Sequence, residues 1–226
     1  MSFELLIKII NSKGYIIREQ LNSIDTLSYF LEMNLQEFDA SVNQCIEGED
    51  LWYEKNAQDL EFHMLEIERR CHNYITAFYS LLGCTRRFRD KLKDNSFFIE
   101  YKNEKNKYFE NVESLLIRNL REYFQHYDIP PIMVVIKEQF FGYERDKKNI
   151  FLDSGKLLKY ERLNAELKKY LSENNIDLVS LLHKHNSRLR KFYKWFNSYI
   201  YGKYAKELEA LQQYEKEYRE NIQHQP

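Results

Sequence analysis

Apolar residues between positions 60 and 81 recur with the spacing of one long, covered helix. Successive members are four, three, four, three, four and three residues apart: Leu60, Met64, Ile67, Cys71, Tyr74, Phe78 and Leu81. This repeat lines one side of an α-helix with an apolar stripe, which other helices must cover to exclude water. The stripe predicts a long helix from about Leu51 to Lys91 inside a helical bundle.

The scarcity of turn-forming residues favours the same fold class. The 226 residues include only 6 glycines and 3 prolines. Sandwiches and barrels need more turn residues than this, whereas long helices exclude both types. The 18 tyrosines and 15 phenylalanines are expected to fill helix interfaces. We therefore expect a mainly α fold, a long-helix bundle formed as a single helical domain over residues 1–226.

Apolar periodicity extends to the rest of the chain. It predicts further helices at 16–42, 96–127, 157–171 and 178–196, and Pro130-Pro131 must end the second of these. Residues 1–14 show no clear period and fit either a strand or a short helix. The charged, amphipathic segment 203–226 is expected either to fray or to mediate dimer contacts.

The segment around residues 132–153 differs in composition from the helical segments. Ile132–Ile136 is rich in β-branched residues, and Ile150–Leu152 repeats that character after the polar, turn-like segment Gly142–Asn149. This pattern predicts one small β-hairpin around residues 132–153. An isolated hairpin is marginal in water, so we expect it to pack on the helices.

Charge and cysteine content narrow the function classes. The chain has 34 basic and 35 acidic residues, a net charge of −1. A dedicated duplex-DNA binder carries a basic excess, so any nucleic-acid contact here must be local or built from two chains. Three cysteines without a CxxC pair favour reduced thiols and a cytoplasmic location. No stretch approaches the roughly 20 apolar residues that span a bilayer, and we expect no membrane partner.

Common cofactor and metal motifs are missing from the sequence. It contains neither a glycine-rich phosphate loop nor a Gly-x-Ser-x-Gly elbow, and we expect no cofactor. His183 and His185 are two residues apart and so face opposite sides of a helix, and His63 with Glu66 is only a partial ligand set. We expect no metal site. Because His185 lies on an apolar stripe, a core or interface histidine is the favoured interpretation.

Arg86, Arg87 and Arg89 form a basic cluster near a predicted helix end. A solvated helix face is the favoured interpretation, since cations near a helix C-terminus are stabilised by the helix dipole. A phosphate-contacting patch is the alternative.

A second cluster carries more specific chemistry. Arg121-x4-His126 lies in the last turns of a predicted helix that prolines then end. RNA can be cut without metal if a base removes the 2′-hydroxyl proton while a cation stabilises the pentacovalent phosphorus. Histidine titrates near neutrality and transfers protons. Arginine stays charged and matches phosphate oxygens in pairs.

The sequence Leu-Arg-x-Tyr-x-x-His followed by Pro resembles the HEPN (higher eukaryotes and prokaryotes nucleotide-binding) superfamily over about fifteen residues. The resemblance implies a helical domain, often dimeric, that places two Arg–His pairs in one cleft and cleaves RNA in toxin or antiphage defence systems. It implies that Arg121 contacts phosphate and that His126 is the catalytic histidine. It also implies a homodimer, an RNA substrate and an antitoxin or defence-system protein partner.

Two positions depart from the family's usual pattern. Members commonly place Asn, Asp or His directly after the arginine, where this chain has Glu122. One toxin class has a tyrosine two residues after the histidine, where this chain has Asp128. The resemblance therefore does not extend to that toxin class or to its nucleotidyltransferase partner.

The expected site consists of catalytic Arg121 and His126 together with four substrate-contacting neighbours: Arg118, Asn119, Glu122 and Tyr123. The alternative is a non-catalytic helical scaffold or partner-binding protein, in which Arg121 forms a surface ion pair and His126 contacts the helix-end carbonyls. A second match to the spacing, Arg219-x4-His224, lies in the C-terminal segment and is attributed to chance.

Overall fold

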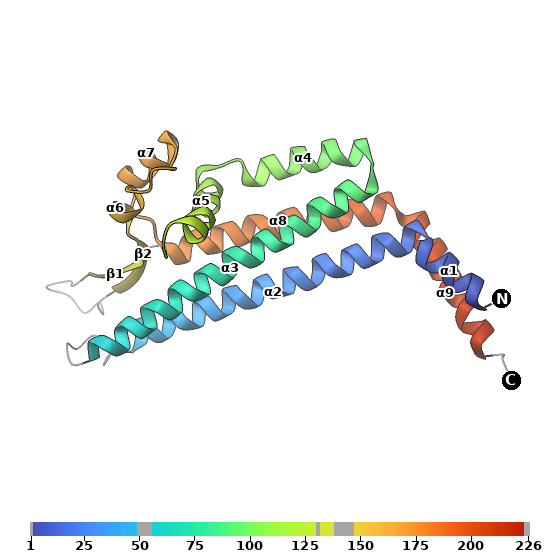
Figure 1. The fold of residues 1–226 in the computed structure, drawn as a ribbon, viewed down its shortest axis with the longest axis horizontal. Coiled ribbons are helices and arrows are strands. Elements are labelled where there is room, and N and C mark those ends of the chain that lie inside the picture. Colours follow the sequence, from blue (N-terminus) through green and yellow to red (C-terminus); the bar gives the residue numbers. More distant parts are fainter. Residues whose placement is uncertain (1, 49–55, 130–131, 138–146, 224–226) are drawn as a thin grey trace.

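The computed structural model describes residues 2–48, 56–129, 132–137 and 147–223. Over these residues the chain forms nine helices and one two-stranded sheet (Figure 1). The expected fold class, a mainly α bundle with one small hairpin, is confirmed.

Three long helices form the body of the molecule: α2 (Lys13–Glu47), α3 (Ala57–Leu92) and α8 (Leu178–Lys203). They run alongside one another through most of its length (Figure 1). The predicted apolar stripe of α3 faces this interior, and five of its seven members are buried: Ile67, Cys71, Tyr74, Phe78 and Leu81. Burial of this stripe is the driving force that aligns the three helices.

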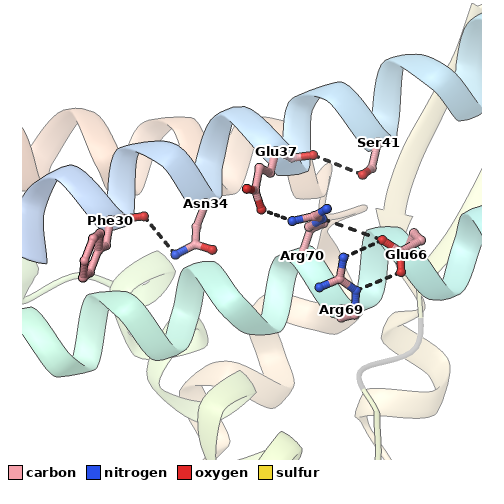
Figure 2. Close-up of polar contacts among 7 residues, drawn as sticks. All are labelled: Phe30, Asn34, Glu37, Ser41, Glu66, Arg69 and Arg70. Carbon is pink, nitrogen blue, oxygen red and sulfur yellow. Dashed lines mark hydrogen bonds and ion pairs between the residues drawn. The ribbon is translucent and has the colours of Figure 1, made fainter.

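Charged side chains border the α2–α3 interface (Figure 2). Arg70 of α3 pairs with Glu37 of α2, and Arg69 pairs with Glu66 at 2.7 Å within α3. Such exposed pairs contribute roughly 0–1 kcal/mol each. The Arg70–Glu37 pair, which joins the two helices, therefore favours one pairing of α2 with α3, while the buried stripe supplies most of the stability.

The two terminal helices form an arm at one end of the bundle (Figure 1). Residues 2–11, for which the sequence left strand and helix open, form α1 (Ser2–Asn11), which packs on α9 (Ala205–Gln223). Lys13 at the start of α2 pairs with Glu207 at 3.0 Å. Helix α9 packs against both α1 and α2, and the two expectations for residues 203–226, fraying or dimer contacts, stay predictions.

The predicted helix 96–127 is in fact two helices, α4 (Asn95–Phe109) and α5 (Val112–His126). Asn111 adopts an extended backbone between them, and its side chain accepts a hydrogen bond from the Ser114 N–H at 2.9 Å. An asparagine at this position caps a new helix more favourably than it continues an old one. The prediction of one continuous helix was wrong for that reason.

The hairpin lies at the opposite end of the molecule from the termini (Figure 1). Strand β1 (Ile132–Lys137) pairs antiparallel with β2 (Lys147–Leu152), with Ile132 opposite Leu152. The predicted turn-like segment Gly142–Asn149 ended too late, because the second strand begins at Lys147. Residues 138–146 lie outside the described residues. The Leu152 N–H donates to the Ile176 carbonyl at 2.9 Å, which ties the sheet to the segment before α8.

The predicted helix 157–171 began too early. The single turn α6 (Ser154–Leu157) ends where that helix was predicted to begin, and the helix α7 (Ala165–Glu173) starts only after residues 158–164. The Asn164 side chain accepts the Leu167 N–H at 2.8 Å and so starts α7 separately. None of the helices in the described part of the chain is both long and apolar enough to cross a bilayer.

Candidate functional site on helix α5

Helix α5, which carries the Arg–His motif, is fixed by its core face and its first turn. Leu116, Ile117 and Leu120 are buried against the rest of the bundle. Arg188 of α8 donates to the Asn111 side-chain oxygen at 3.1 Å and pairs with Glu113. The start of α5 is therefore tied to α8, and its C-terminal turns extend from that anchor.

Arg121 is half-buried and lies over an aromatic ring. Its guanidinium carbon is 4.3 Å from the centre of the Tyr79 ring on α3. A cation over a ring is attracted by about 0.5–2 kcal/mol, so Tyr79 holds the guanidinium without neutralising it. Burial raises the pKa of Tyr79 to about 12, against the opposing positive charges of Arg118 and Arg121. The charged groups of Arg118, Arg121 and Glu122 thus all lie close enough to Tyr79 to affect the pKa of its hydroxyl.

His126 is the last residue of α5 and its imidazole is exposed. Five residues separate it from Arg121, which corresponds to about 140° around the helix axis and about 7.5 Å along it. Among the interactions between described residues, no hydrogen bond joins the two side chains. A single chain therefore presents the two members of the motif on different sides of α5.

Two of the expected substrate-contacting residues lie in the interior. Asn119 is 8% exposed, and its amide donates to the Leu115 carbonyl at 2.9 Å. Tyr123 is 3% exposed, and its ring centre lies 5.2 Å from that of Tyr160. These two residues hold α5 in place, whereas Arg118, Arg121, Glu122 and His126 reach the surface or its border.

A cavity of about 430 Å³ opens beside Arg118, where α4 ends and α5 begins. Tyr79 of α3 and Lys105 of α4 line it together with Arg118. Sequence analysis did not identify Tyr79 or Lys105. Both belong to helices distant from the motif in sequence, and the cavity depends on the α4–α5 break.

His185 has the core position expected for it. It is 1% exposed, and its Nδ1 lies 2.9 Å from the Tyr74 hydroxyl. Burial, with a smaller contribution from the charge of Arg188, lowers the pKa of His185 to about 3. His183 is exposed and lies 2.9 Å from Asp39, so the prediction that the two histidines face opposite sides is confirmed.

The basic cluster at the end of α3 is largely solvated. Arg86 and Arg87 are exposed. Arg89 pairs with Asp90 at 2.6 Å and lies 5.0 Å from the centre of the Phe98 ring. The favoured interpretation as a solvated face agrees with this arrangement.

Cys45, Cys71 and Cys84 are buried free thiols, and burial raises the pKa of Cys71 to about 12. Within the described ranges, His, Cys, Asp and Glu side chains form no group of three that could hold a metal ion.

Comparison with known proteins identifies no relative: no family model, curated protein or solved structure matches the chain.

Proposed function

We propose that the protein is a HEPN-like, metal-independent endoribonuclease that acts as a homodimer in a toxin or phage-defence system. The supporting observation is that the charged group of Arg121 and the imidazole of His126 are both without an ion-pair partner in the described part of the chain. Arg121 is held by the ring of Tyr79, with no ion-pair partner among the described residues, and His126 is exposed at the end of the same helix. The arginine charge is thus available to a phosphate, and the imidazole to a proton.

The chemistry follows from these two groups. His126 removes the proton from an RNA 2′-hydroxyl, and the 2′-oxygen attacks the adjacent phosphorus. Arg121 binds the phosphate oxygens, where negative charge builds up in the pentacovalent transition state. The bond to the 5′-oxygen breaks, and this oxygen takes a proton from a solvent water molecule as it leaves. The products are a 2′,3′-cyclic phosphate and a 5′-hydroxyl end.

A second copy of the chain can bring a histidine opposite the arginine of the first. Arg121 and His126 are about 140° apart around an ideal α-helix, so one straight helix directs them to different sides. In a two-fold dimer, Arg121 of one protomer can face His126 of its partner. The two α5 helices would then form two equivalent composite sites.

The test is cleavage of total RNA and of a tRNA mixture in the presence of EDTA. We expect wild type to leave 2′,3′-cyclic phosphate ends, and Arg121→Ala and His126→Ala each to lose activity by roughly 100-fold or more. Arg219→Ala is the matched control, because it removes the arginine of the second, coincidental match on α9 and should change nothing. All variants must keep the wild-type circular dichroism spectrum and oligomeric state.

The second candidate, a partner-binding helical protein, is favoured by the exposed face of α1. Phe3, Ile7 and Ile10 recur at helical spacing and are 70%, 44% and 46% exposed. Exposed apolar faces of this kind commonly mark interaction surfaces. Failure of the wild-type protein to cleave any RNA would make this function the better assignment.

A further inference from the structure

The cavity beside Arg118 has the size of a small-ligand site. Its volume of about 430 Å³ lies within the roughly 300–1,000 Å³ of known ligand pockets. Three aromatic residues contribute to its lining: Phe78 and Tyr79 from α3, and Phe109 at the end of α4. Aromatic surfaces of this kind are where the bases of single-stranded RNA stack.

Four charged side chains line the same cavity. Lys105 and Arg118 are basic, and Glu110 and Glu166 are acidic. None of the four forms an ion pair within the part of the chain that the structure describes, although opposite charges line one cavity. Their charges sum to zero, so the cavity does not suit a bare polyanion. It suits a ligand that carries both a negative group and hydrogen-bond donors.

We propose that this cavity binds one nucleotide of a single-stranded RNA. Arg118 and Lys105 bind its phosphate, and the base lies against the aromatic side chains. Glu110 and Glu166 accept hydrogen bonds from the exocyclic amino groups of adenine, guanine or cytosine, which uracil lacks.

The proposed pocket is next to the motif arginine. Tyr79 lines the cavity and also lies under the guanidinium of Arg121. Arg118 precedes Arg121 by three residues, or about 4.5 Å along the helix axis. A nucleotide in the cavity would therefore neighbour the phosphate that Arg121 holds, and its role as an RNA subsite rests on the proposed function.

The test is calorimetric titration of the full-length chain with ribonucleoside 5′-monophosphates. We expect adenosine, guanosine and cytidine monophosphates to bind more tightly than uridine monophosphate, and inorganic phosphate to bind least. Arg118→Ala should weaken binding by about tenfold or more, the loss expected for one charged hydrogen bond. Arg219→Ala, on the distant arm, should bind as wild type does.

The conservative variant Glu110→Gln separates recognition of the base from recognition of the phosphate. It keeps the size of the side chain, and it should narrow the difference between cytidine and uridine monophosphate. Unfolding midpoints of all variants should match that of wild type. No binding by wild type, or equal binding by Arg118→Ala and Arg219→Ala, would overturn the proposal.

A cleavage assay separates failure of the pocket from failure of the ribonuclease function. If both hold, Arg118→Ala raises KM for RNA and leaves kcat close to the wild-type value. Cleavage by a chain that binds no monophosphate, with KM unchanged in Arg118→Ala, would overturn the pocket alone. Nucleotide binding that depends on Arg118, in a wild-type chain that cuts no RNA, would overturn the ribonuclease and support the pocket.

Discussion

At the scale of single residues, the position of Arg121 depends on a ring from another helix. Tyr79 of α3 lies 4.3 Å from the guanidinium carbon and is itself packed against Phe78. The ring face provides the attraction, so the Tyr79 hydroxyl is not needed to hold the arginine.

Tyr79→Leu and Tyr79→Phe test this contact as a pair. Tyr79→Leu removes the ring and should lower kcat for RNA cleavage by roughly tenfold, since about 0.5–2 kcal/mol of positioning is lost. Tyr79→Phe keeps the ring and should retain most of the activity. Equal losses in the two variants would show that the hydroxyl, rather than the ring, matters.

His185 makes the stability of the protein depend on pH. Its pKa is about 3 in the folded chain, against an ordinary value of 6.5. The folded state therefore binds this proton less readily than the unfolded state does. The contribution of neutral His185 is fully present above pH 6.5 and is lost as the pH falls towards 3, at up to about 1.4 kcal/mol per pH unit.

His185→Gln should remove this part of the pH dependence. Glutamine does not titrate and can still hydrogen-bond to the Tyr74 hydroxyl, which lies 2.9 Å from His185 Nδ1. We expect the free energy of unfolding in urea to fall less between pH 7 and pH 5 in the variant than in wild type. Parallel curves over that range would contradict the assignment.

The burial or exposure of a side chain was predictable from sequence where the position of the residue on a helix face decides it. The apolar stripe indicated that His185 is buried, and the two-residue spacing indicated that His183 is exposed. The burial of Asn119 and the contact between Arg121 and Tyr79 were not predictable. Each depends on which neighbouring helix packs against α5, and that choice is made by tertiary packing.

At the scale of elements, side-chain caps determined which predicted helices stayed whole. Asn111 and Asn164 each accept a backbone N–H three residues ahead and so begin new helices. Apolar periodicity continues across both positions, so periodicity alone merged α4 with α5 and began α7 too early. The helix-capping residues were visible in the sequence, but asparagine is also tolerated inside helices.

The close approach between α2 and α9 gives an element-scale prediction. A Cβ on Gly14 would lie 2.2 Å from the backbone oxygen of Glu207, whereas one on Gly202 would meet nothing within 4 Å. Gly14→Ala should therefore push α9 away and destabilise the protein by about 1–3 kcal/mol. Gly202→Ala, inside α8, should be neutral or stabilising by up to about 1 kcal/mol.

Urea unfolding of the two variants provides the measurement. Their difference isolates the steric contact, because both exchange a helical glycine for alanine. Limited proteolysis should also cut Gly14→Ala within residues 205–223 faster than wild type. Equal stability of the two variants would mean that α9 does not need to approach α2 so closely.

At the scale of the whole molecule, the fold class follows from sequence and the arrangement of the site does not. The α3 stripe, the scarcity of glycine and proline, and the β-branched pair of segments were enough to predict a helical bundle with one hairpin. The α1–α9 arm and the cavity between α4 and α5 arise from contacts between distant segments. Such contacts leave no periodic signal.

The central claim, that Arg121 and His126 act together across a dimer, can be tested by mixing two inactive variants. Arg121→Ala and His126→Ala are purified separately, unfolded and refolded together, and assayed for RNA cleavage in EDTA. If half of the dimers are mixed and each mixed dimer has one intact composite site, activity should return to about a quarter of wild type. Cleavage by wild type, none by either variant alone and partial recovery in the mixture are the predicted results. An inactive wild type, a variant that cleaves alone, or a mixture that stays inactive would contradict the account.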